Sequence, residues 1–216
     1  MKANILIILT ILVVLISSCR TREIAYFKLT DEVKQVIPYE KGDIVSFMDS
    51  DGQVINFMVT ENITRWAHVS DNNFRNDYYS FEIKEATLKS EINNLVIKLK
   101  ISNPICDPDD CDPNDVNNDL YILSIGVEYY ELGFNNICTD RKGDFLTSTY
   151  ISNDSIEIST IFSEFMEINN NVFYNVVESI LKNNNTQYIY RRLLYSKTYG
   201  ILQVCKDGEI LLTINN

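Results

Sequence analysis

The chain is poor in the residues from which catalytic and metal centres are commonly built. Its 216 residues include one histidine, His68, and one tryptophan. No CxxC pair, nucleophile elbow or phosphate-binding loop occurs in the sequence. A histidine-based metal site or a Ser-His-Asp triad would therefore have to be built around His68 alone. The sequence predicts no catalytic residue, and we interpret His68 as a loop or strand-end residue.

Positive charge is also scarce. Lys and Arg together number 19 against 30 Asp and Glu, which gives a net charge of −11. A surface of this sign repels the phosphates of DNA and RNA and the headgroups of anionic lipids. The composition therefore predicts no nucleic-acid partner.

One long apolar run is present, at the start of the chain. Lys2 precedes an almost wholly apolar stretch without charge over residues 5–16, and the stretch closes on Ile16-Ser17-Ser18-Cys19. The order of basic, apolar and small residues is that of a secretory signal peptide. The run is shorter than the roughly 20 apolar residues of a membrane-spanning helix. We therefore expect an exported protein.

The end of this run, Ile-Ser-Ser-Cys, resembles a bacterial lipobox. The resemblance implies that residues 1–18 are removed and that Cys19 receives diacylglycerol, which makes it a membrane anchor. Two or more acyl chains on one residue hold a protein stably at a bilayer. By the same resemblance to small lipoproteins of Gram-negative bacteria, Arg20 is not the aspartate of inner-membrane retention, which implies the outer membrane. An ordinary signal peptide that ends near a cysteine is the alternative.

From residue 43 onward, apolar and polar residues alternate with period two, which is typical of half-buried strands. The clearest example places one apolar row opposite two lysines: Leu95, Ile97, Leu99 and Ile101 against Lys98 and Lys100. Asp-Gly pairs at 51–52 and 207–208 predict hairpins, the first with a type I′ turn. We expect a lipidated tether over residues 19–36 and one all-β domain over 37–216. Its antiparallel sheet should be built of hairpins and be curved or sandwich-like.

The stretch 172–182 is ambiguous. Phe173, Val176, Val177, Ile180 and Leu181 fit the apolar face of a helix. Their β-branched and aromatic side chains favour a strand instead. We predict a strand here, with one short helix as the alternative.

Four cysteines remain after Cys19, an even number that indicates two disulfides in an exported chain. Cys106 and Cys111 are close enough in sequence for a turn to join them. Cys138 and Cys205 would then form the second pair. Free buried thiols are the competing interpretation.

The segment from Cys106 to Asp119 is strongly acidic and lacks lysine and arginine. Carboxylate and amide oxygens are the ligands that Ca²⁺ prefers. The candidate ligands are Asp107, Asp109, Asp110, Asp112, Asn114 and Asp115. An EF-hand loop that begins at Asp110 would need glycine where Asp115 stands and glutamate where Tyr121 stands. We therefore interpret the segment as a solvated acidic loop, with a calcium site as the weaker alternative and no other cofactor.

These observations favour a non-enzymatic envelope lipoprotein that binds a protein or a glycan. Such a protein should carry an exposed apolar or aromatic patch. A carrier of an apolar molecule is the first alternative, with a cavity lined by rows such as Leu95, Ile97 and Leu99. A carboxylate-based hydrolase is the second, since paired carboxylates leave no local signature in a sequence.

Overall fold

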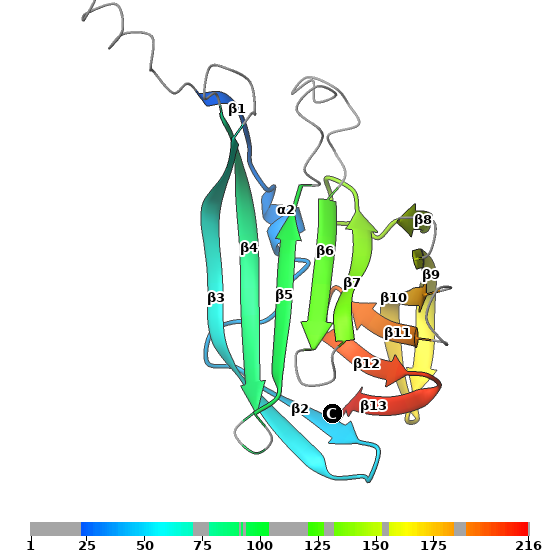
Figure 1. Ribbon diagram of the computed structural model, residues 1–216. Coiled ribbons are helices and arrows are strands. Elements are labelled where there is room, and N and C mark those ends of the chain that lie inside the picture. Colours follow the sequence, from blue (N-terminus) through cyan, green and yellow to red (C-terminus); the bar gives the residue numbers. More distant parts are fainter. Residues whose placement is uncertain are drawn as a thin grey trace, which may run out of the picture.

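The computed structural model describes residues 23–70, 78–90, 92, 94–103, 121–127, 132–152, 156–183 and 189–215. The predicted all-β class is confirmed (Figure 1). The elements in chain order are β1 (Glu23–Phe27), α2 (Asp31–Lys34), β2 (Ile44–Asp49), β3 (Val54–Ser70), β4 (Tyr78–Ser90), β5 (Val96–Ser102), β6 (Tyr121–Val127), β7 (Leu132–Thr139), β8 (Ser148–Ser152), β9 (Ile156–Ile168), β10 (Asn171–Asn183), β11 (Ile189–Ser196), β12 (Gly200–Lys206) and β13 (Glu209–Ile214).

All the strands belong to one sheet, in which β2 to β13 pair antiparallel in the order β7-β6-β5-β4-β3-β2-β13-β12-β11-β10-β9-β8. The sheet bends until β7 contacts β9, β10 and β11 near its other end, so that it forms a nearly closed, barrel-like wall. Within the described residues, no helix is long and apolar enough to cross a membrane.

Both predicted Asp-Gly hairpins are present, but their turns differ. Asp207 and Gly208 both have positive φ, 51° and 88°, as the two-residue type I′ turn between β12 and β13 requires. Between β2 and β3 only Gly52 has positive φ, so the type I′ prediction there is wrong. The Asp49 carboxylate instead accepts hydrogen bonds from the backbone amides of Asp51 and Gln53. This side chain stabilises a longer turn that ends in the left-handed glycine.

The ambiguous stretch 172–182 is a strand, and the helical alternative is wrong. It lies within β10, which is hydrogen-bonded to β9 on one side and to β11 on the other. Asn169 and Asn170, with φ of 51° and 63°, form the turn that pairs β10 with β9. Partner strands on both edges satisfy the backbone as fully as a helix would, and they suit β-branched side chains better.

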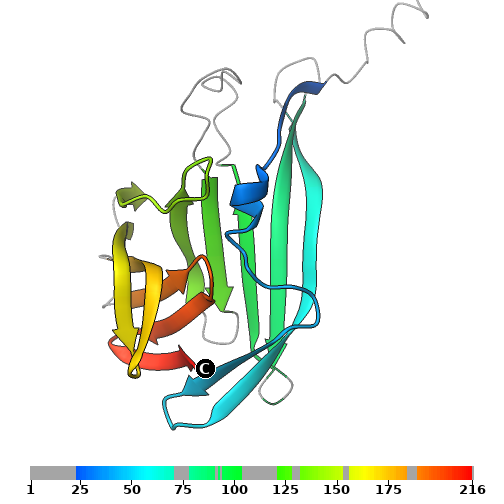
Figure 2. The same cartoon turned by 180° about the vertical axis from the view of Figure 1, so that it is seen from behind.

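The expected tether over residues 19–36 requires correction, because the domain begins earlier than residue 37. β1 pairs in parallel with the start of β4, and α2 follows after a Thr30 cap whose hydroxyl accepts from the Val33 amide. In Figure 2 the chain around α2 crosses the concave side of the sheet. The apolar side chains of this N-terminal segment, residues 28–43, are 0–4% exposed: Leu29, Val33, Val36, Ile37 and Tyr39. Charged residues lie between these apolar residues in the sequence. Their spacing was therefore the only local sign that they are buried.

The core lies between this N-terminal segment and the inner face of the sheet. The row predicted from residue 95 is confirmed: its four apolar members are 0–1% exposed, whereas Lys98 is exposed. Phe47 of β2 and Phe57 of β3 are fully buried in this core and meet edge to face at 5.4 Å between ring centroids.

Candidate functional site

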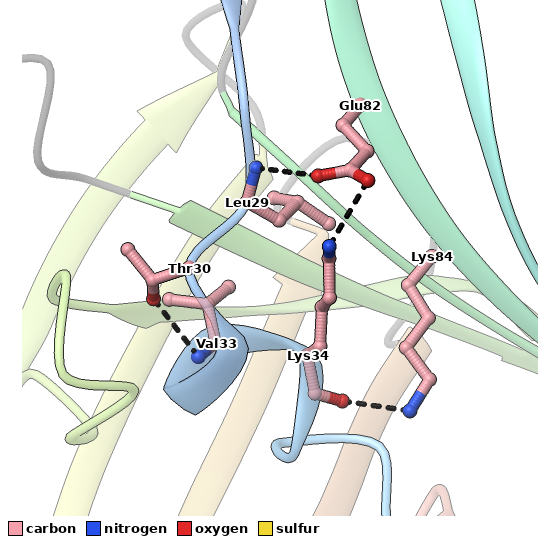
Figure 3. A network of polar contacts seen from close by, with 6 residues as sticks. All are labelled: Leu29, Thr30, Val33, Lys34, Glu82 and Lys84. Carbon is pink, nitrogen blue, oxygen red and sulfur yellow. Dashed lines mark hydrogen bonds and ion pairs between the residues drawn. The ribbon is translucent and has the colours of Figure 1, made fainter.

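Two charged residues on the inner face of β4 hold the N-terminal segment (Figure 3). The Glu82 carboxylate accepts a hydrogen bond from the Leu29 amide at 3.0 Å and pairs with the Lys34 ammonium at 3.0 Å. Lys84 donates to the carbonyl oxygens of Lys34 and Ile37 at 2.8 and 3.0 Å. Burial lowers the pKa of Lys84, and the nearby Glu40 carboxylate opposes that shift. Because these bonds satisfy buried charges and helix-end carbonyls, we interpret the cluster as structural.

Two buried tyrosines attach the other side of the segment to β11 and β12. The Tyr195 hydroxyl donates to the Val36 carbonyl at 2.7 Å, and the Tyr39 hydroxyl accepts from the Ile201 amide at 2.7 Å. Desolvation raises the pKa of both phenols well above the usual value of 10. Neither phenol is therefore suited to acid–base chemistry near neutral pH.

The N-terminal segment belongs to the core on the inner face of the described sheet. Leu95, Ile97 and Leu99, the residues expected to line a carrier cavity, are buried in the same core cluster as the N-terminal segment. Among the described residues, two hollows open at the surface. One of about 370 Å³ lies beside Tyr39, Ile44 and Tyr199, and another of about 410 Å³ lies beside Phe145 and Phe162.

His68 lies on β3 and is exposed. Its Nδ1 atom is 2.9 Å from the Ser80 hydroxyl, and its ring meets that of Tyr78 edge to face at 5.4 Å. Both neighbours belong to β4, and β3 ends two residues later at Ser70, so His68 lies near the end of its strand, in agreement with the strand-end prediction. Among the described residues, no group of three or more His, Cys, Asp and Glu side chains gathers as metal ligands do.

Two of the four cysteines predicted to form disulfides, Cys138 and Cys205, lie within the described residues. Cys138 and Cys205 are free thiols, so the disulfide expected between them is not formed. They lie in β7 and β12, which are not neighbours in the sheet. Cys205 is buried, its thiol contacts the Gln203 side chain at 3.5 Å, and its burial raises the pKa of the thiol. The remaining candidates lie outside the described residues: Cys19, Cys106, Cys111, Asp107, Asp109, Asp110, Asp112, Asn114 and Asp115.

The most prominent apolar patch on the described surface lies on the β9–β10 hairpin. Tyr174 and Phe165 are directly paired across the two strands, which places both side chains on the same face. They are 61% and 65% exposed. Val172 and Ile161 extend this face along β10 and β9 and are 50% and 47% exposed. We call these four residues the hairpin patch.

Polar groups surround the hairpin patch. Glu167 lies opposite Val172, and Glu178 lies opposite Ile161, where it pairs with the Arg192 guanidinium. The turn at Asn169 and Asn170 ends the hairpin a few residues beyond Phe165. An exposed apolar patch with a polar rim is typical of a binding surface.

Sequence reasoning missed the hairpin patch. In β9 the row that contains Thr160 faces inward there, since Thr160 is 2% exposed, although Phe162 of the same row is 40% exposed. The opposite row contains Ile161 and Phe165, which are apolar as well. Apolar residues on both faces of a strand are compatible with two situations: a strand buried on both sides, or a strand with one buried face and one binding face. Only the tertiary structure distinguishes these two situations.

Comparison with known proteins adds no assignment to this geometry. No protein-family profile, curated protein or solved structure matches the chain.

Proposed function

We propose that this chain is a membrane-anchored envelope lipoprotein, acylated at Cys19, whose domain is a non-enzymatic module that binds a partner protein through the hairpin patch. The observation that carries the proposal is the exposed cross-strand pair of Phe165 and Tyr174. With about 200 Å² per aromatic side chain, the two rings leave roughly 250 Å² of mostly apolar surface in water. Patches of a few hundred Å² on a monomer are often functional.

The chemistry of the hairpin patch favours a protein over a glycan. Ile161 and Val172 flank the rings, whereas a sugar site needs hydrogen-bond donors and acceptors around the aromatic platform. Residues 156–183 contain four glutamates and one lysine. A partner with an apolar centre and a basic rim would therefore complement this hairpin.

The alternatives have weaker support. The carrier would need a cavity where the N-terminal segment packs against Leu88 and Ile97. The hydrolase would need converging carboxylates, and the most buried one that we find in the described chain, Glu82, is engaged by the Leu29 amide and Lys34.

The proposal is tested with a photo-crosslinking amino acid at Tyr174 in cells of the source bacterium. A matched variant carries the same amino acid at Ile63, an exposed apolar position on β3 that is 43% exposed. We expect one discrete protein adduct from position 174 and none of that mass from position 63. Mass spectrometry then identifies the partner, and Phe165→Ala should remove the adduct because it deletes half of the paired aromatic surface.

Equal crosslinking at both positions, adducts to glycan only, or no adduct from position 174 would contradict the binding role. Mass spectrometry of the N-terminal peptide tests the anchor independently. An unmodified Cys19 would overturn the lipoprotein assignment even if the hairpin patch binds a protein.

A further inference from the structure

A second exposed aromatic surface lies where β1 joins the sheet. The first residues of β4 pair with β1, and its later residues, from Ile83 onward, pair with β5. Tyr26 lies opposite Ser80, and Ser80 lies opposite His68 on β3, so these side chains share one face across three strands. Trp66 and Tyr78 lie two residues from His68 and Ser80 and point to the same face. We call Tyr26, Trp66, His68 and Tyr78 the aromatic ledge.

The aromatic ledge is well exposed for a group of rings. Tyr26 is 71% exposed and Trp66 is 45% exposed. The edge-to-face contact with His68 holds Tyr78 in place. Farther along the same face of β4, Glu82 binds the Leu29 amide, and there the N-terminal segment covers the sheet. Trp66 lies opposite Glu82 at the border of this cover, and the rest of the ledge extends from there toward the ends of β3 and β1.

One residue of the ledge, Tyr26, lies on β1, the described element closest in sequence to the proposed lipid anchor. Four residue steps separate Cys19 from Glu23, where β1 begins. Four extended residues span at most about 14 Å, and Tyr26 lies about 10 Å farther along the strand. Charge at this end differs from that of the whole chain. Residues 20–28 contain three basic residues, Arg20, Arg22 and Lys28, and one acidic residue, Glu23. This local positive charge suits anionic headgroups.

We infer that the aromatic ledge lies in the headgroup region of the bilayer that holds the Cys19 lipid. Tryptophan and tyrosine favour this region because their rings are apolar and their tips are polar. The inference rests on the proposed lipid anchor and adds an orientation to it. In Figure 1, β1 and the hairpin turn between β9 and β10 lie at opposite ends of the domain. The β9–β10 turn, and the Phe165 and Tyr174 pair close to it, therefore lie at the end of the domain away from the membrane.

The single tryptophan of the chain makes this orientation measurable. The full-length lipidated protein is reconstituted in vesicles of phosphatidylethanolamine and phosphatidylglycerol, with and without spin-labelled phospholipid. The reference sample is the protein from which the acyl chains have been removed enzymatically, in detergent-free buffer. We expect Trp66 in the vesicle-bound protein to emit at shorter wavelength than in this reference. The spin-labelled lipid should quench most of this emission, and acrylamide should quench it several-fold less than in the delipidated protein.

The matched control moves the fluorophore to the other end of the domain. The double variant Trp66→Phe with Tyr174→Trp should show no quenching by spin-labelled lipid and full access to acrylamide. Mass spectrometry confirms Cys19 acylation in every sample. Acylated protein in which Trp66 is not quenched by lipid would overturn the orientation and leave the anchor intact. Equal quenching at positions 66 and 174 would also overturn it, whereas unacylated Cys19 would overturn the proposed function itself.

Discussion

The Tyr39 hydroxyl accepts a hydrogen bond from the Ile201 amide at 2.7 Å, across 162 positions of sequence. The contact joins the N-terminal segment to the first residues of β12. It also requires a glycine beside it, because a Cβ atom at Gly200 would lie 2.0 Å from the Tyr39 hydroxyl. The segment next to the proposed anchor is therefore built into the domain.

Gly200→Ala should be strongly destabilising. Its φ of +75° disfavours any side chain, and the added methyl group would also displace Tyr39. We expect a loss of about 3 kcal/mol in the free energy of unfolding. Gly208→Ala is the control, because its φ is +88° with no atom within 4 Å of the added Cβ, and it should cost about 1 kcal/mol. Urea unfolding measures both, and equal losses would show that Tyr39 does not fill this position.

Glu82→Ala should loosen the N-terminal segment. It leaves the Leu29 amide and the Lys34 ammonium without their partner in a largely buried setting, which should cost about 2 kcal/mol. Glu85→Ala on the same strand is the matched control, since its partner Arg65 is an exposed surface residue and the change should be small. Hydrogen exchange of residues 28–39 should accelerate in Glu82→Ala only. Unchanged exchange there would contradict the anchoring role.

Stability should fall at alkaline pH. Burial raises the pKa of Tyr39 and Tyr195 in the folded state, whereas the unfolded phenols ionise near pH 10. The stabilisation is therefore complete below about pH 10 and is lost as the pH rises toward the folded pKa, by about 1.4 kcal/mol per pH unit for each phenol. Urea titrations on both sides of pH 10 measure this slope. Tyr195→Phe should reduce the slope, and an unchanged slope would contradict its burial.

The thiols of Cys138 and Cys205 should be free. Without reductant, alkylation followed by mass spectrometry should label Cys138, which is half-buried, before Cys205. Burial both shields the Cys205 thiol and raises its pKa, so its labelling should require unfolding. A peptide pair joined through Cys138 and Cys205 would contradict the structure and restore the disulfide predicted from sequence.

Local patterns in the sequence determined much of this fold. Alternation around Ile97, Leu99 and Ile101 identified a buried row because period two follows from strand geometry alone. The Asp207-Gly208 pair identified a hairpin because positive φ is a local requirement. The export and lipidation that we propose rest on a local signal of the same kind, the apolar run that ends at Cys19.

Only the tertiary structure decided which surfaces are buried. Leu29, Val33 and Val36 lie in a stretch that the sequence predicts to be a polar tether, yet they are buried in the core. Glu82 and Lys84, about 50 residues away, bind the backbone of this N-terminal segment and hold it there. Phe165 and Tyr174 are exposed because no described strand or loop covers that face of the β9–β10 hairpin. Burial depends on contacts between residues far apart in sequence, which periodicity does not encode.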